Sequence, residues 1–256
     1  MTRRRKKSGS DQHWLIGFHA VESALDNDPS RIVDVIFEKG NNNPRLRQLR
    51  DAVRTQQIGN RDGTREELDQ LSGKSRHQGV AARYQPPQSL DEKSFLQQLK
   101  NTEQPPLVLV ADGVQDPHNL GAILRTSDAA GVTGVVVPRD RAVGLTPTVC
   151  KVASGAADSM PLIRVVNLAR SLDHLKDAGL WVIGTSDQAQ QSVFDVDLSG
   201  PVAIVVGQEG AGMRRLTAER CDQLVRLPMA GTVSSLNVSV ATGICLFEAV
   251  RQRAAK

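Results

Sequence analysis

From residue 107 onward the sequence alternates short apolar runs with longer segments of helical spacing. The runs LVLVADGV, GVVVP, PLIRV, LWVIGT and PVAIVVG are rich in β-branched residues and have no polar face. Such runs are typical of strands that are buried on both sides. Their alternation with helices predicts a parallel sheet with helices on both faces. Ligands of such sheets bind at the carboxyl ends of the strands, so the loops that follow the strands should hold the functional site.

A smaller α/β unit precedes this region. Helical spacing is found in IGFHAVESALDN, NPRLRQLRDAVRTQQ and TREELDQLSG, and RIVDVIFEKG and HQGVAARYQ have the composition of strands. Two proline pairs, Pro86-Pro87 and Pro105-Pro106, bracket a segment with one short helical pattern. We therefore predict a small α/β domain over residues 14–85, a linker over 86–105 and the parallel-sheet domain over 106–256.

Residues 1–13 are predicted to be a disordered basic tail. The chain has 32 Lys and Arg against 28 Asp and Glu, and residues 3–7 (RRRKK) supply five of the basic residues. Without that run, 27 basic side chains face 28 acidic ones, so the positive charge belongs to the tail. A basic tail suits RNA phosphates through counterion release, and a solubilising end is an equal alternative.

Membrane and metal sites are not expected. No segment approaches the roughly 20 apolar residues of a membrane helix, and the N-terminus lacks the apolar core of a signal peptide. We therefore predict a cytoplasmic protein. The three cysteines are far apart and the five histidines form no metal-binding spacing, so no metal site is predicted.

The first loop of interest is DGVQDPHNLGAILRTSD. Asn119 is predicted to cap the helix that follows the Asp116-Pro117 turn. Arg125 lies further along this helix among apolar residues. A guanidinium near a buried surface needs an anionic partner, for which phosphate or carboxylate would serve.

The second loop, VVGQEGAGM, follows a buried strand. Its glycines Gly207, Gly210 and Gly212 allow the backbone to approach a ligand closely. The spacing is neither that of a dinucleotide fingerprint nor that of a Walker loop, which argues against a nucleotide-dependent oxidoreductase. Because Glu209 would repel a polyphosphate, a neutral or cationic ligand is predicted.

The third loop reads LPMAGTVSSLNVSVATGICLFEAV. Ser234, Ser235 and Asn237 all stand where a helix cap belongs, although one cap is enough. The surplus of polar groups beside apolar side chains predicts a ligand here. An adenine ring could lie among the apolar residues while the polar groups fix its orientation.

Together the three loops resemble the three motifs of the SpoU (TrmH-type) branch of the SPOUT RNA ribose methyltransferases. The matching pieces are DPHNLGAILRTSDAAGV, GQEGAGM and LPMAGTVSSLNVSVATGICLFEAVRQR, and the resemblance covers residues 107–253. The segments IGFHAVESAL and HQGVAAR are similar to that family's small substrate-binding domain. The resemblance implies an α/β catalytic domain with a C-terminal trefoil knot, a homodimer, and S-adenosylmethionine as cofactor.

The resemblance also implies roles for individual residues. The catalytic positions that it implies are Asn119, Arg125, Glu209, Ser235 and Asn237. The cofactor-binding positions that it implies are Gly184, Gly207, Leu227, Met229 and Leu236. The implied reaction methylates the ribose 2′-hydroxyl of a guanosine in 23S ribosomal RNA, in the loop that contacts P-site tRNA. It needs no metal, because a sulfonium methyl is already electrophilic.

The role of Arg125 needs care, because a guanidinium stays protonated in proteins. We expect Arg125 to hold an RNA phosphate and stabilise the developing alkoxide rather than to act as the base, and His118 could compete as a base. Glu209 would orient its loop through backbone amides or pair with Arg125. Two alternatives stay open: a methyltransferase for transfer RNA, and a non-catalytic RNA-binding protein. Aromatic residues are only 3% of the chain, so RNA recognition should depend on shape, phosphate and hydroxyl contacts.

Overall fold

The computed structural model describes residues 13–73, 76–85 and 89–255. Its contacts divide the chain into two compact units, residues 1–87 and 88–256. The basic run of the predicted tail and the first proline pair of the predicted linker lie outside the described residues. Among the described helices, none has the length and apolar character needed to cross a membrane.

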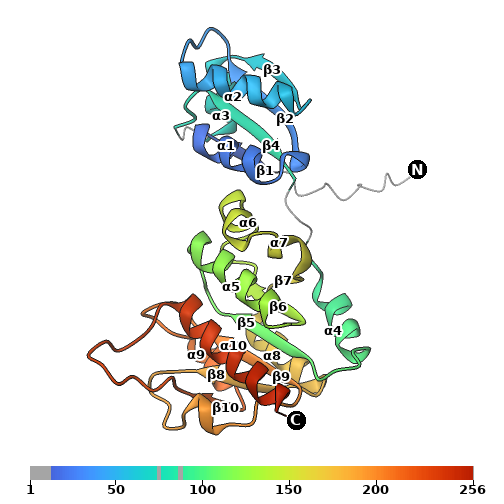
Figure 1. The fold of residues 1–256 in the computed structure, drawn as a ribbon, viewed down its shortest axis with the longest axis vertical. Coiled ribbons are helices and arrows are strands. Elements are labelled where there is room, and N and C mark those ends of the chain that lie inside the picture. Colours follow the sequence, from blue (N-terminus) through green and yellow to red (C-terminus); the bar gives the residue numbers. More distant parts are fainter. Residues whose placement is uncertain (1–12, 74–75, 86–88, 256) are drawn as a thin grey trace, which may run out of the picture. The chain divides into compact units, whose positions relative to one another are not determined.

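The first unit is built on a four-stranded sheet in the order β1-β4-β2-β3 (Figure 1). Strand β4 pairs antiparallel with β1 and β2, whereas β2 and β3 are parallel. The strands are β1 His13–Ile16, β2 Ile32–Glu38, β3 Gly59–Gly63 and β4 Val80–Tyr84. The helices are α1 Phe18–Asn27, the short η1 Pro29–Arg31, α2 Pro44–Thr55 and α3 Arg65–Leu71.

Helices cover both faces of this small sheet. On one face Val21 of α1 and Leu49 and Val53 of α2 pack with Phe37 of β2. On the other face Leu68 of α3 packs with Ile36 and Ala81. The sequence predicted the three helices and two of the strands. It missed β1, which follows the tail, and β3, whose sequence GNRDG contains no apolar side chain to signal a strand.

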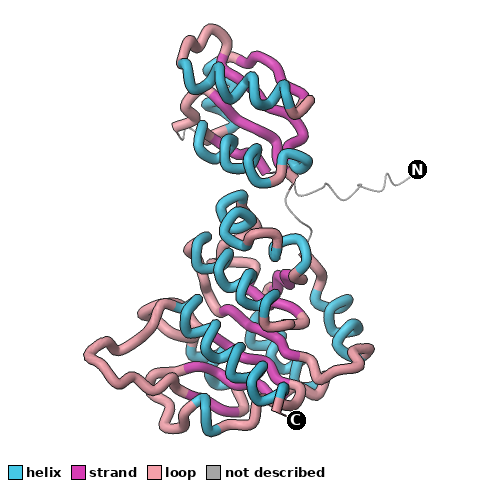
Figure 2. Tube along the Cα trace, viewed as in Figure 1, coloured by secondary structure: helices cyan, strands magenta, loops and turns pink. Residues whose placement is uncertain are grey.

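The second unit is built on six strands, all parallel, in the order β10-β8-β9-β5-β6-β7 (Figures 1 and 2). The strands are β5 Leu107–Ala111, β6 Gly134–Pro138, β7 Leu162–Val165, β8 Trp181–Thr185, β9 Val202–Val206 and β10 Gln223–Val225. The helices are α4 Glu92–Lys100, α5 Pro117–Ala129, α6 Pro147–Ala153, α7 Ala156–Ser159, α8 Leu168–Asp177, η2 Val193–Asp195, α9 Arg215–Glu219 and α10 Val238–Ala254.

Two apolar clusters form the core of this unit, one on each face of the sheet. Helices α5, α6, α7 and α10 contribute to one cluster, and α4 and α8 contribute to the other. The prediction of a parallel sheet with helices on both faces is therefore confirmed. The segment TPTVCKVASGAA forms two short helices, α6 and α7, because Ser154 and Gly155 adopt left-handed conformations with φ of 50° and 92°.

Helix α4 belongs to the core of the second unit, although residues 86–105 were predicted to be a linker. Its Phe95 and Leu99 are buried in the cluster that includes α8. Gly134 of β6 allows this close approach, since a Cβ atom there would lie 2.5 Å from the Phe95 ring. The helix between the two proline pairs is therefore part of the packed domain.

The C-terminal helix is held to the start of the domain by Arg253. Its guanidinium donates to the carbonyl oxygens of Pro105, Pro106, Leu198 and Gly200 at distances of 2.7–3.3 Å. These carbonyls lie just before β5 and β9, which are neighbours in the sheet. One side chain thus joins the last helix to the segments that lead into β5 and β9.

Candidate active site

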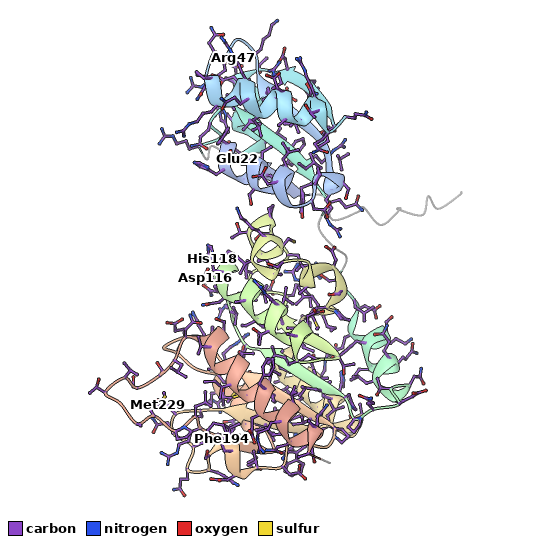
Figure 3. The ribbon with its side chains drawn as sticks, viewed as in Figure 1. Glu22, Arg47, Asp116, His118, Phe194 and Met229 are labelled. Carbon is purple, nitrogen blue, oxygen red and sulfur yellow. The ribbon has the colours of Figure 1, made fainter. Side chains whose placement is uncertain are left out.

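A cavity of about 450 Å³ lies at the carboxyl ends of β8, β9 and β10. It is lined by residues 185–188 after β8, by residues 206–213 after β9, and by side chains from residues 227–241 after β10. Figure 3 shows Met229 in the last of these loops. The second and third loops identified in the sequence therefore meet at one edge of the sheet.

Four of the predicted cofactor positions line this cavity: Gly207, Leu227, Met229 and Leu236. The predicted position Gly184 does not. Gly184 is buried within β8, where an added Cβ atom would lie 2.6 Å from Cys221 Sγ and 2.7 Å from Met213 Cε. It provides room for the side chains that support the loop after β9.

The loop after β9 depends on Gly207. Gln208 and Gly212 exchange two backbone hydrogen bonds of 2.9 and 2.8 Å, which close the loop into a tight turn. A Cβ atom on Gly207 would lie 2.1 Å from the carbonyl carbon of Gly212 and 2.2 Å from the amide nitrogen of Met213. Backbone atoms cannot move aside as a flexible side chain can, so only glycine fits here.

The side chain of Asn237 joins all three loops. Its Nδ2 donates to Asn119 Oδ1 at 2.9 Å and to Glu209 Oε2 at 3.0 Å. Its Oδ1 accepts from the backbone N–H of Ser239 at 2.9 Å and from the Ser239 hydroxyl at 2.6 Å. Because the carboxylate can only accept and the backbone N–H can only donate, this orientation of the amide is fixed.

The cap of α5 differs from the prediction, whereas the cap of α10 is one of the three predicted candidates. Asp116, not Asn119, caps α5 by accepting from the N–H of His118 at 2.9 Å. Pro117 takes the first helical position, where its missing N–H costs nothing, and Asn119 falls within the first turn. At α10 the cap is Asn237, while Ser234 and Ser235 are exposed and line the cavity.

Arg125 lies on the exposed side of α5, because Ile123, Leu124 and Ser127 occupy the buried side. The expectation of a partly buried guanidinium was therefore wrong. Its Nη1 donates to the Ser154 hydroxyl at 3.4 Å, and no described acidic residue pairs with it. Glu209, one of whose expected roles was to pair with Arg125, accepts from Asn237 instead. Neither Arg125 nor the exposed His118 at the start of α5, which is labelled in Figure 3, is among the residues that line the cavity.

A buried ion pair positions the loop after β9 from its far end. Asp112, fully buried at the end of β5, accepts from the backbone N–H of Arg214 at 2.9 Å and from its Nε at 2.7 Å. Arg214 lies two residues after Gly212, the last residue of the turn. No local sequence pattern signals this pair, because Asp112 and Arg214 are about a hundred residues apart.

The sequence also missed the wall formed by residues 185–188. The polar segment SDQAQQ after LWVIGT was the available signal. Thiolate chemistry is not indicated at Cys221 or Cys245, because burial raises the pKa of both thiols to about 12 and keeps them protonated. Within the described part of the chain, no group of three or more His, Cys, Asp or Glu could hold a metal ion.

Family models match both units of the chain. The model of the SpoU rRNA Methylase family matches residues 106–247, and the model of the RNA 2′-O ribose methyltransferase substrate-binding domain matches residues 14–90. A relative from Pseudomonas putida named 23S rRNA (guanosine-2′-O-)-methyltransferase RlmB is 51% identical over 242 residues. The match covers 94% of this chain and 97% of the relative.

Solved structures agree with the family models. A crystal structure of an RNA 2′-O ribose methyltransferase has a TM-score of 0.60 at 30% identity, covering 96% of this chain and 90% of that one. An AdoMet-bound rRNA methyltransferase from Sinorhizobium meliloti has a TM-score of 0.59 at 25% identity, covering 94% and 87%.

The ion pair predicts unequal effects for two neighbouring arginines. Arg214→Gln should lower the free energy of unfolding by about 2–3 kcal/mol, because it leaves Asp112 buried without its cation. This is less than the about 3–5 kcal/mol typical of fully buried pairs, since Arg214 is 47% exposed. Arg215→Gln should change it by less than about 0.5 kcal/mol, since Arg215 is 78% exposed.

The change in the free energy of unfolding is measured by denaturant unfolding of both variants in a Trp14→Phe background. The fluorescence of Trp181 then reports the second unit alone. Equal destabilisation of the two variants would show that Asp112 does not need its partner.

Proposed function

The chain belongs to the SpoU rRNA methylase family, and from this membership we propose that it transfers the methyl group of S-adenosylmethionine to the 2′-hydroxyl of a guanosine in 23S ribosomal RNA. The observation that carries the proposal is the union of the three loops. Asn237 ties the second loop to the first and third, and the second and third loops form one cavity.

The residues of this cavity suit S-adenosylmethionine. A volume of about 450 Å³ is within the range of about 300–1,000 Å³ usual for small-ligand sites. Leu227, Met229 and Leu236 provide apolar surface for an adenine ring. Asp187 and Glu209 provide carboxylates for a ligand that carries a sulfonium and an ammonium group. When bound, the cofactor supplies a methyl group that is already electrophilic.

The chain's own contribution to the reaction is positioning and electrostatics. Holding a ribose hydroxyl in line with the methyl group can lower the barrier by roughly 7–11 kcal/mol. Asn237 and Glu209 fix the loops that surround the reacting groups. Arg125, with no described acidic partner, would hold an RNA phosphate and stabilise negative charge on the ribose oxygen, while phosphate or water accepts the proton. Asn119 and Ser235 complete the proposed catalytic set, and His118 is the competing base.

The two units divide this work in the proposal. Residues 14–85 grip the RNA, and residues 106–256 bind the cofactor and carry out the transfer. The match of residues 14–90 to a substrate-binding model supports the first role. The proposed target is the loop that contacts P-site tRNA, and the reaction would occur in the cytoplasm, where ribosomal RNA is found.

We further propose that the C-terminal part threads a trefoil knot. After β10 the chain crosses the β8–β9 connection, where Arg226 N donates to Gln191 O and Val193 N donates to Arg226 O at 2.8 and 2.9 Å. It then continues to α10, which packs on α5 under the middle of the sheet. An experimental structure in which residues 226–237 pass outside the β8–β9 connection would exclude the knot.

A homodimer is also proposed, on the evidence of α10. Thr242, Cys245 and Ala249 are buried against the unit itself, yet Val240 and Phe247 on the other side are 51% and 48% exposed. A helix that is apolar on both sides is usually covered on both sides. A second copy of the chain is the proposed cover.

The function is tested by incubating the protein with tritiated S-adenosylmethionine and RNA from a strain that lacks the enzyme. Label should enter 23S ribosomal RNA at one guanosine ribose. Gly207→Ala should lose cofactor binding by at least about tenfold in calorimetry, because its Cβ cannot fit. The matched control Gly231→Ala, with open space around its Cβ, should bind normally.

The outcome also separates the alternatives. Label in transfer RNA would favour the tRNA methyltransferase, and tight RNA binding without label in any RNA would favour the non-catalytic protein. Mapping the labelled nucleotide decides whether the P-site loop is the target.

The role of Arg125 predicts the behaviour of Arg125→Lys. The variant keeps the positive charge but loses the fork of donors that can hold phosphate at two points, so kcat should fall about 10- to 100-fold with unchanged cofactor affinity. Arg170→Lys, an exposed arginine of α8, is the control. Full activity of Arg125→Lys would rule out two-point phosphate binding.

The dimer predicts a change of mass on substitution in α10. Sedimentation should give twice the chain mass of 27.7 kDa for the natural protein, and Phe247→Glu should shift it toward the single-chain value. Leu216→Glu, at a residue 57% exposed on α9, should leave the mass unchanged. A natural protein with the mass of one chain would contradict the proposal.

A further inference from the structure

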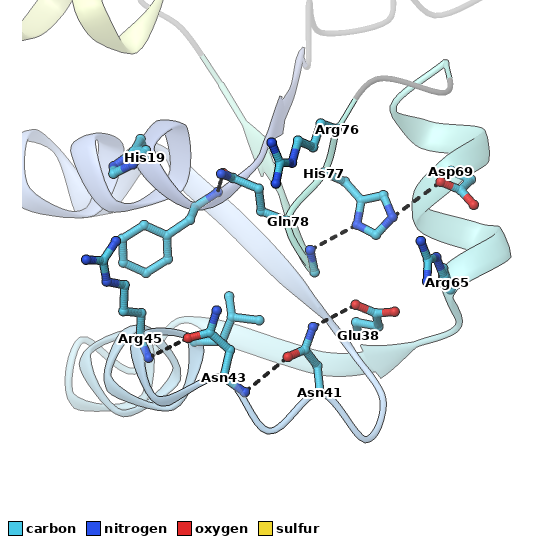
Figure 4. Close-up of a pocket in the computed structure, with 13 residues that line it drawn as sticks. His19, Glu38, Asn41, Asn43, Arg45, Arg65, Asp69, Arg76, His77 and Gln78 are labelled. Carbon is cyan, nitrogen blue, oxygen red and sulfur yellow. Dashed lines mark hydrogen bonds and ion pairs between the residues drawn. The ribbon is translucent and has the colours of Figure 1, made fainter.

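The first unit contains a cavity of its own, of about 570 Å³, between α1, α2, α3 and the loop before β4 (Figure 4). We propose that this cavity holds one unpaired nucleotide of the RNA substrate, with its phosphate on arginine side chains and its base on an aromatic ring. The inference rests on the proposed function and adds a second site to it, distinct from the methyl-transfer cavity.

The charge of the cavity is the first argument. Arg45, Arg65 and Arg76 line it from three different segments. None of the three has an ion-pair partner among the described residues. The two acids of the cavity are already bonded, since Glu38 accepts from Asn41 at 2.8 Å and Asp69 lies 3.3 Å from His77 Nε2. Three guanidiniums thus face two carboxylates, so the Arg, Asp and Glu of the lining carry a formal charge of +1, and the guanidinium donors can hold an anion.

The side-chain amides are the second argument. Asn43 Oδ1 accepts from the N–H of Arg45, and Gln78 Oε1 accepts from the N–H of Phe18, both at 3.0 Å. Each amide oxygen is thus occupied, which leaves each NH₂ group as a donor. Together with the arginines, these groups form a site lined mainly by donors. Such a site selects a ligand rich in acceptors, as phosphate and base-edge oxygens are.

The backbone around the cavity is fixed and in part strained. Gln78 adopts φ of 53°, which is unfavourable for a residue with a side chain. His77 is buried, and its Nδ1 accepts from the N–H of Gly79 at 3.0 Å, so the loop is held from both sides. Strain of this kind clusters at functional sites, although the described residues Gln57, Arg141 and Ser154 share it outside this cavity.

An aromatic residue is available for the base. Phe37 and Tyr84 are buried in the first unit, whereas Phe18 is partly exposed and lines the cavity. Its ring lies edge to face with that of His19, with centroids 5.3 Å apart. Unpaired bases in RNA are commonly bound by stacking on such rings and on guanidinium planes. A paired base could not enter, because its edge and faces are covered within the helix.

The test uses the full chain and 23S ribosomal RNA transcribed in vitro, with binding measured between 50 and 200 mM salt. Arg65→Gln with Arg76→Gln should weaken binding by about tenfold or more. It should also reduce the slope of log K against log salt by about 0.7, because the one phosphate held by these arginines is no longer neutralised. The control pair Arg47→Gln with Arg54→Gln removes the same charge from α2 outside the cavity. It should leave the slope unchanged.

Phe18→Leu, which keeps apolar volume against the core, should weaken binding about 5- to 150-fold because base stacking is removed, with an unchanged salt slope. The proposal is overturned if the Arg65/Arg76 pair behaves like the control pair, or if the natural protein does not bind this RNA. RNA binding with the expected slopes but no methyl transfer would refute the proposed function and leave this site standing. Normal methylation, together with unchanged RNA binding in the Arg65/Arg76 and Phe18 variants, would refute this site and leave the proposed function standing.

Discussion

The side chain of Asn237 is the contact on which the rest of the site depends. An amide has two donor hydrogens and two acceptor lone pairs, and here all four are used. The acceptors end the loop after β10 by capping α10, and the donors hold the loops after β5 and β9. No other side chain of this shape can make the same four hydrogen bonds. Aspartate cannot donate, and leucine can neither donate nor accept. Three separate loops therefore behave as one wall.

This wall needs a rigid base, which the parallel sheet provides. The strands β5, β8 and β9 are neighbours, so their carboxyl ends meet at one edge and their loops start within reach of one another. The loop after β9 is then fixed at three points. Gly207 allows it to turn back on itself, Asn237 holds Glu209 at its middle, and Asp112 holds Arg214 at its end. A cavity formed in this way is largely organised before any ligand arrives.

The sequence predicted what depends on local pattern and failed where a contact joins distant residues. Apolar runs located strands β5 to β9, and the resemblance of the following loops to the SpoU motifs implied Gly207, Leu227, Met229 and Leu236, which line the cavity. The cap of α5 was misplaced because Asp116 and Asn119 are both good caps, and only Pro117 at the first helical position decides between them. The Asp112–Arg214 pair and the role of Gly184 behind the loop depend on packing, which no short window of sequence contains.

The two cavities differ in charge in a way that fits two different ligands. Among the described residues that line the cavity at β8–β10 there is no lysine, arginine or histidine, and there are two carboxylates. The cavity of the first unit also has two carboxylates, Glu38 and Asp69, but adds three arginines that form no ion pair with any described acid. A polyanion such as RNA would be repelled by the cavity at β8–β10 and attracted by the cavity of the first unit. A cationic methyl donor would be attracted by the cavity at β8–β10 and repelled by the other. Affinity for RNA therefore has to come from groups outside the cofactor cavity, such as Arg125 and the first unit. A small domain with its own basic site is a physical solution to this conflict, because it supplies attraction for RNA without placing positive charge beside the sulfonium.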